Sequence, residues 1–192
     1  MAHPWGINNL VLKILLAVLT VVAVFAVVVA TRPSTYHVER SVLVNAPPAV
    51  PYAVVSDFHR FGGWSPWEHL DPAMKKAYEG PATGAGSVYH WEGNKDVGAG
   101  TMTILESEAP QRVLMSVEFL RPFPSKAKAT YSFKPEGAGS RVTWALDSEA
   151  NFMVKGMQMF NLMDSMLGKD FESGLGRLKQ MSESPTNVVA AP

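Results

Sequence analysis

One acidic residue near the C-terminus is placed where a carboxylate could do chemistry. Asp164 is flanked by the mostly apolar residues Leu162, Met163, Ser165, Met166 and Leu167. A carboxylate in such a setting needs a cationic partner, or its pKa rises because burial disfavours the charged form. With a raised pKa it could orient a ligand or act as a general base. The alternative is an ordinary boundary residue that is solvated or pairs with a basic residue such as Lys95 or Arg121.

Aromatic and methionine side chains could provide apolar contacts to a ligand. Trp64 and Trp67 lie in an aromatic-rich loop and could form a wall that stacks on a ligand, or they could simply pack in the core. For Trp144, core packing is the expected role. Six of the ten methionines lie between residues 153 and 181. Methionine is flexible, so this concentration suits either a cavity that accepts several shapes or an irregular core.

Two polar residues on predicted strands, Glu118 and Tyr131, could also face a ligand, although a shift of one residue in strand register would reverse their facing. The predicted ligand-binding residues are Trp64, Trp67, Tyr89, Trp91, Met115, Glu118, Tyr131, Met157, Phe160, Met163, Asp164 and Leu167. Asp164 is the one catalytic candidate among them, and we identify no acid–base partner for it.

Several other chemistries are not supported by the sequence. The chain has no cysteine, which excludes thiolate catalysis and disulfides. Its five histidines lack the spacing of metal ligands, and no GxSxG nucleophile motif is present. Lys plus Arg and Asp plus Glu are equal at 17 each, so no basic surface for nucleic acid is expected. We therefore expect no cofactor, no metal and no nucleic-acid partner.

The element that must position these residues is a long helix predicted over residues 151–183. Apolar residues recur there at steps of three and four, which places them on one stripe of a helix. The stripe consists of Phe160, Met163, Leu167, Phe171, Leu175, Leu178 and Met181. A helix this long, roughly 45 Å at about 1.5 Å per residue, must lie across something wide.

The segments before this helix have the pattern of a sheet. Residues 36–45 alternate between apolar and polar positions, as a half-buried strand does. Two short helices and an aromatic loop follow. Further strands are predicted at residues 75–79, 87–91, 100–108, 112–120, 127–134 and 141–148. Gly or Pro occurs in the intervening breaks, which favours an antiparallel meander. A curved sheet around a straight helix leaves a gap between them, and such gaps become ligand cavities.

The composition of the N-terminal segment predicts a membrane anchor within residues 1–31. Between residues 10 and 30 the only charged residue is Lys13. These 21 residues span about 30 Å as a helix, which matches the hydrocarbon core of a bilayer. The alternative is a cleaved signal peptide, since Val28 and Ala30 are small residues before Thr31. We expect a single-pass membrane protein. The flanking charges do not assign the side on which the domain lies.

Residues 36–183 resemble the START-like (SRPBCC) helix-grip superfamily, in its polyketide cyclase/dehydrase and lipid-transport branch. The segments that carry the resemblance are FGGWSPWEHLDPAMKKAYEGP, GSVYHWEGNKDVGAGTMTILESEAP, EFLRPF, SRVTWAL and MDSMLGKDFESGLGRLK. The resemblance implies an α+β helix-grip fold at residues 32–183, in which a curved antiparallel sheet wraps around the C-terminal helix. It also implies one cavity for a small apolar or amphipathic ligand. Only some members of the family are enzymes. The expected organisation is one transmembrane helix, this domain, and a disordered tail at residues 184–192.

Three functions fit these observations. The first is a membrane-anchored domain that binds a hydrophobic or lipid-like ligand between the sheet and the C-terminal helix. The second is an enzyme of the polyketide cyclase/dehydrase type. The third is a non-catalytic interaction or stress-related module with a vestigial cavity. Fold-level resemblance does not choose among them.

Overall fold

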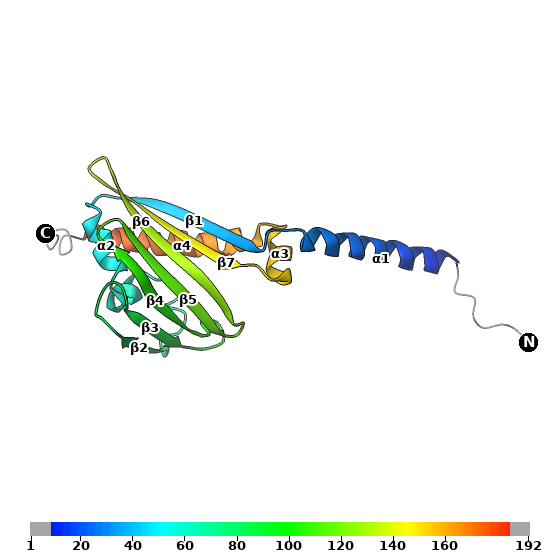
Figure 1. Ribbon diagram of the computed structural model, residues 1–192, viewed down its shortest axis with the longest axis horizontal. Helices are drawn as coiled ribbons and strands as arrows, with labels where there is room; N and C mark the ends of the chain where they lie inside the picture. Colours follow the sequence, from blue (N-terminus) through cyan, green and yellow to red (C-terminus); the bar gives the residue numbers. More distant parts are fainter. Residues whose placement is uncertain (1–8, 185–192) are drawn as a thin grey trace, which may run out of the picture.

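The computed structural model describes residues 9–184. An N-terminal helix, α1 (Asn9–Ala30), leads into one sheet with helices packed on it (Figure 1). The other helices are α2 (Ala49–Val55), the 3-10 helix η1 (Phe58–Gly63), α3 (Phe152–Gln158) and α4 (Leu162–Glu183). Residues 185–192 of the predicted disordered tail lie outside the described residues.

The seven-stranded sheet is an antiparallel meander of β2 to β7 with β1 added at the β7 edge. The strands are β1 (Thr35–Val44), β2 (Lys75–Glu79), β3 (Val88–Glu92), β4 (Ala99–Glu108), β5 (Arg112–Arg121), β6 (Ser125–Glu136) and β7 (Gly139–Glu149). Their spatial order is β1-β7-β6-β5-β4-β3-β2. The predicted curved antiparallel sheet around a C-terminal helix is confirmed, and each predicted strand is present with its bounds shifted by a few residues at most.

Helix α4 lies on the concave face of the sheet and follows β1 in the same direction. Near its start, Arg40 of β1 bonds Asp164, and near its end the Lys179 ammonium donates to the Leu43 carbonyl at 2.6 Å. Between these points the Phe171 ring stacks on the Trp144 ring of β7, with centroids 4.0 Å apart. The buried core therefore lies between α4 and the concave face.

The C-terminal segment differs from the prediction of one continuous helix over residues 151–183. The helix is interrupted between Gln158 and Leu162, where Asn161 adopts a left-handed conformation with φ of 52°. Asparagine tolerates this conformation better than most residues. Asn151 begins α3, and its side chain accepts a hydrogen bond from the Val154 backbone N–H. The apolar spacing continues through the break, which is why periodicity alone did not reveal it.

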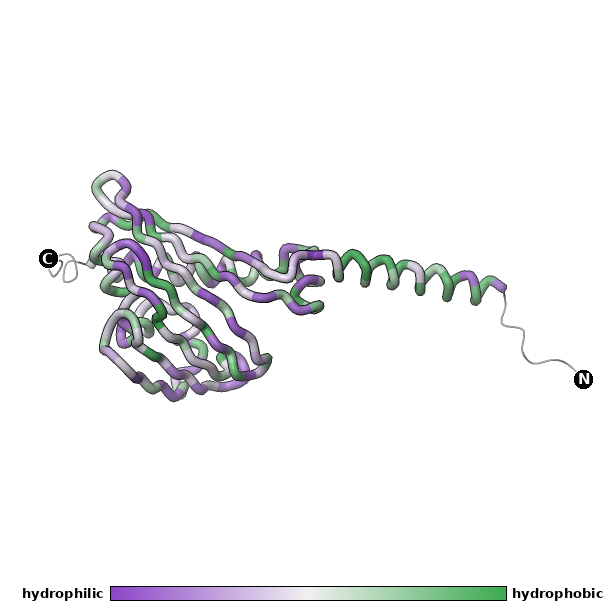
Figure 2. The backbone as a smooth tube through the Cα atoms, in the orientation of Figure 1, coloured by the Kyte–Doolittle hydropathy of each residue, from purple (hydrophilic) through white to green (hydrophobic). Residues whose placement is uncertain are grey.

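Helix α1 extends away from the sheet, and its exposed side chains are almost all apolar (Figure 2). By length and composition it could cross a membrane, and it equally fits a signal sequence. Its last turn is fixed to the domain. Val29 is fully buried, and the Arg32 backbone N–H bonds the Val29 carbonyl. The backbone N–H of Ala150, just after β7, bonds the Ser34 carbonyl at 2.8 Å. No long loop therefore separates α1 from β1.

Candidate functional site

The concave face of the sheet is closed at one end and open at the other. Along β5, Val113, Met115 and Val117 are 0%, 1% and 7% exposed, whereas Phe119 on the same face is 38% exposed. Side chains on α4 follow the same trend, because Leu178 and Phe171 are fully buried and Leu167 and Met163 are only half-buried. Phe119 lies toward the end of the sheet where β1 begins and β7 ends. The side chains of Phe119, Leu167 and Met163 are therefore partly accessible to solvent at the end next to α1.

The closed end is filled by aromatic side chains. Trp64 packs edge-on against both Tyr131 and Trp144, with ring centroids 5.8 and 5.7 Å apart. Burial raises the pKa of the Tyr131 hydroxyl well above its ordinary value, so this residue stays neutral. Met115 is also fully buried in this core. Of the predicted ligand-binding residues, Trp64, Tyr131 and Met115 thus lie in the packed core.

The open end combines small side chains on the strands with partly exposed rings at the margin. Ala127 and Ala129 of β6 face the concave side and are themselves buried in the core, 5% and 3% exposed. Trp91 lies over Gly100, and a side chain at residue 100 would come within 2.3 Å of its ring. The Trp91 ring also meets Phe119 edge-on at 5.9 Å. Trp91 and Phe119 therefore form one wall of the open end.

The opposite wall comes from α4 and the loop after η1. Leu167 packs against the core cluster and is half-buried. Trp67 donates from its indole N–H to Asp170 of α4 at 3.3 Å and packs edge-on against Trp144. Met157 and Met163 are half-buried, whereas Phe160 is 66% exposed. The predicted residues on α3 and α4 thus lie around the opening, with Phe160 turned toward solvent.

Asp164 is not placed to act as a base on a bound ligand. Its carboxylate is exposed and forms a two-point ion pair with the Arg40 guanidinium, at 2.8 and 3.0 Å. This pairing lowers the pKa of Asp164 below its ordinary value of 3.8. Arg40 also bonds Glu172 at 3.0 Å and passes over Gly168, where any side chain would collide with it. The partner of Asp164 is therefore Arg40, whereas Lys95 and Arg121 were the residues suggested from sequence.

Replacing Asp164 with Asn is expected to lower the free energy of unfolding by no more than about 1 kcal/mol, because the pair is exposed. The folded state lowers the pKa of Asp164, so this contribution is present above pH 3.8, its ordinary pKa, and is lost as the pH falls through the folded pKa. Urea unfolding of both proteins across pH 3–7 checks this. A difference that grows on acidification, or loss of bound ligand in Asp164→Asn, would contradict it.

Glu118 lies on the convex face, opposite the core residues of β5. Its carboxylate accepts a hydrogen bond from Lys126 at 2.7 Å, and both side chains are well exposed. It therefore does not line the concave surface in this structure. The sequence did not fix this facing, because it depends on the strand register, and a shift of one residue reverses it.

A buried carboxylate at the open side of the sheet was not singled out from the sequence. Glu68 is the only buried acidic residue within residues 9–184, and its side chain is 4% exposed. One carboxylate oxygen accepts a hydrogen bond from the Tyr89 hydroxyl and the other pairs with the Lys76 ammonium. Burial and the neighbouring carboxylate raise the pKa of Tyr89 strongly, so its hydroxyl remains a donor. The one signal in the sequence was a Glu inside the aromatic segment WSPWEHL.

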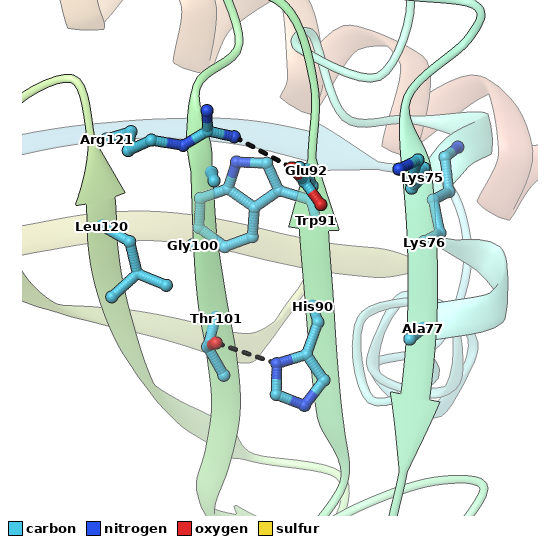
Figure 3. A pocket seen from close by; sticks show the side chains of 11 residues that line it. Lys75, Lys76, Ala77, His90, Trp91, Glu92, Gly100, Thr101, Leu120 and Arg121 are labelled. Atoms are coloured by element: carbon cyan, nitrogen blue, oxygen red, sulfur yellow. Dashed lines mark hydrogen bonds and ion pairs between the residues drawn. The ribbon is translucent and has the colours of Figure 1, made fainter.

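A separate open hollow of about 450 Å³ lies on the convex face of β2–β5 (Figure 3). Figure 3 shows the His90 imidazole bonded to the Thr101 hydroxyl at 2.9 Å, and the Arg121–Glu92 pair at 3.3 Å. These polar side chains lie on the face away from α4, while Trp91 and Gly100, which belong to the wall of the open end, also line the hollow. Among residues 9–184, no three His, Asp or Glu residues are grouped to hold a metal ion.

The similarity to a known protein family lies in the domain and does not include the N-terminal helix. Residues 35–183 match the family described as polyketide cyclase/dehydrase and lipid transport. Protein CV1439 from Chromobacterium violaceum is similar in structure, with a TM-score of 0.56 and 14% identity over 80% of this chain and 99% of that one. The di-domain ARO/CYC protein BexL from the BE-7585A biosynthetic pathway has a TM-score of 0.57 and 16% sequence identity. The match covers 82% of this chain and 53% of that one.

Protein TTHA0849 from Thermus thermophilus gives a TM-score of 0.54 with 19% identity, over 77% of this chain and 97% of that one. No curated protein matches the sequence. At these identities the structural likeness concerns the fold alone. The match over residues 35–183 bears out the START-like (SRPBCC) resemblance drawn from the sequence motifs.

Proposed function

Since this chain belongs to the polyketide cyclase/dehydrase and lipid-transport family, we propose that it binds a small apolar or lipid-like molecule while tethered to a membrane by α1. The observation that carries this proposal is the exposure gradient on the concave face, where apolar side chains become accessible only toward one end. A ligand of this class would lie between Leu167 and Trp67 on one side and Trp91 and Phe119 on the other. Burial of its apolar surface would supply most of the binding free energy.

The position of α1 supports the same proposal. The accessible end of the concave face is also the end at which α1 joins the domain (Figure 1). A membrane span there holds the opening close to lipid and raises the effective concentration of a lipidic ligand. In this proposal residues 1–31 are the membrane anchor and residues 32–183 are the ligand-binding domain.

Catalysis of the cyclase or dehydrase type is the weaker candidate. It would need a titratable group free to exchange a proton with a ligand. Both oxygens of Glu68 already have partners, and Asp164 is paired outside the concave surface. The structure supplies no specific observation in favour of an enzyme.

Native mass spectrometry of the full-length protein, released from cell membranes in mild detergent, tests the proposal. Wild-type protein is expected to carry a co-purified apolar molecule. Leu167→Trp places a larger ring in the opening at a half-buried position, and its ligand occupancy is expected to fall by about tenfold or more, equivalent to about 1.4 kcal/mol. The matched control is Ser173→Trp, because Ser173 is exposed on the same helix, α4.

Each outcome of this experiment is decisive once circular dichroism shows that both variants fold. Equal ligand occupancy in wild-type protein and Leu167→Trp would show that the ligand does not bind at the concave site. Bare protein in every preparation would favour the interaction-module alternative. Loss of ligand from Leu167→Trp, with retention in Ser173→Trp, supports the proposed site.

A further inference from the structure

Exposed apolar side chains gather where the chain turns from α3 into α4. We call this group the α3 patch. It consists of Phe152, Met153, Phe160, Leu162 and Met166, which are 56%, 67%, 66%, 44% and 60% exposed. No residue of α3 is buried. Scattered apolar residues on a surface need no explanation, but a concentration around one short helix marks an interaction site.

The α3 patch is held beside the last turn of α1. The Lys155 ammonium lies 3.5 Å from the Ala30 carbonyl, and the Gln158 side-chain amide donates to the Thr35 carbonyl at 3.3 Å. The fully buried Val29 shows that the end of α1 is packed against the domain. Figure 1 shows α3 between the end of the sheet and the C-terminal end of α1. The position of α3 along the axis of α1 is therefore fixed by packing between the two helices and the domain.

The length of α1 then places the patch at a membrane surface. Its 22 residues span about 33 Å, slightly more than the roughly 30 Å hydrocarbon core of a bilayer. When α1 spans the core, its last turn lies at the boundary with the headgroup layer. Phe152 and Met153 at that level would have apolar surroundings on the bilayer side, and the Lys155 side chain can extend toward the headgroups.

We propose that the α3 patch docks into the headgroup–acyl boundary of the same bilayer that holds α1. This inference rests on the membrane tether of the proposed function and deepens it, because it fixes the orientation of the domain. A docked patch is a short interfacial element whose apolar side chains enter the bilayer by about 5–10 Å. The half-buried Met157 of α3 and Met163 of α4 would then line the way from lipid to the ligand site. A ligand could enter without crossing bulk water.

The absence of cysteine from the sequence permits a clean test in the full-length protein. Single-cysteine variants Met153→Cys and Phe160→Cys, labelled with the environment-sensitive fluorophore NBD, are reconstituted in nanodiscs of phosphatidylcholine and phosphatidylglycerol. Doxyl-labelled lipids serve as the quencher. Both labels are expected to emit at shorter wavelength than in water and to lose about half of their emission or more, as residues at the boundary do.

Two further positions act as controls. Leu105→Cys on β4 is 45% exposed and lies about 20 Å further along the sheet from the α1 end, counting six residues of strand. Its label is expected to behave as in water. Val21→Cys, in the middle of α1, reports on the tether itself and should be quenched strongly by lipids labelled deep in the acyl chain.

The outcomes separate this inference from the proposed function. If the label at residue 21 is quenched while those at 153 and 160 emit as in water and are not quenched, the patch does not dock. The membrane tether is then still supported. An unquenched Val21 label overturns the tether, and the docking with it. Short-wavelength emission at 153 and 160 that lipid does not quench, and that depends on the number of copies per nanodisc, would assign the patch to a second copy and also overturn the proposal.

Discussion

Replacing Phe171 with Ala is expected to lower the free energy of unfolding by about 3–5 kcal/mol, the usual cost of truncating a buried aromatic side chain. Phe171 is fully buried, and its ring lies parallel to that of Trp144 with an interplanar angle of 5°. This stacked pair joins α4 to β7. A cavity there cannot be closed by collapse, because Trp64 and Tyr131 already fix Trp144 from the other side.

The measurement is urea unfolding of the full-length protein in detergent micelles, followed by tryptophan fluorescence. Phe123→Ala is the matched control, since it removes the same type of side chain at a position outside the α3 patch that is 76% exposed. We expect the control to change the free energy of unfolding by no more than about 0.5 kcal/mol. Similar losses in the two variants would mean that α4 does not pack on the sheet as described.

The sheet could be predicted from sequence because its determinants are local. Period-two alternation and Gly- or Pro-containing turns define each strand within a few residues of chain. The stripe on α4 was also predictable from Leu167 to Leu178, where helical spacing and burial agree. Phe160 continues the same spacing but is exposed, because one left-handed residue, Asn161, turns the chain. A single dihedral angle leaves no periodic trace in a sequence.

The candidate site was less predictable, because its polar residues depend on contacts between distant segments. Asp164 and its partner Arg40 are 124 residues apart. Only the alignment of β1 with α4 brings them together. Glu68 becomes buried through contacts with β2 and β3 that no motif encodes. The position of the opening could not be predicted from the sequence either, since it depends on where α4 and the loops stop covering the concave face.

The buried pair between Glu68 and Lys76 gives the second large expected effect. Lys76→Met leaves the Glu68 carboxylate with only the Tyr89 hydroxyl as a described partner. Removing one partner of a buried ion pair costs about 3–5 kcal/mol, and because Lys76 is itself 34% exposed we expect about 3 kcal/mol. Lys126→Met is the control, since its pair with Glu118 is exposed on both sides and should cost about 1 kcal/mol or less.

A double variant, Glu68→Gln with Lys76→Met, distinguishes a buried charge from lost packing. Replacing the carboxylate removes the uncompensated charge, so the double variant is expected to be more stable than Lys76→Met alone by about 1 kcal/mol or more. Urea unfolding gives both values. Equal stability of the two would show that Lys76 contributes only its methylene groups. Because Glu68 lies in the same loop as Trp67, Lys76→Met should also loosen the wall at the opening and weaken ligand retention, which Lys126→Met should not.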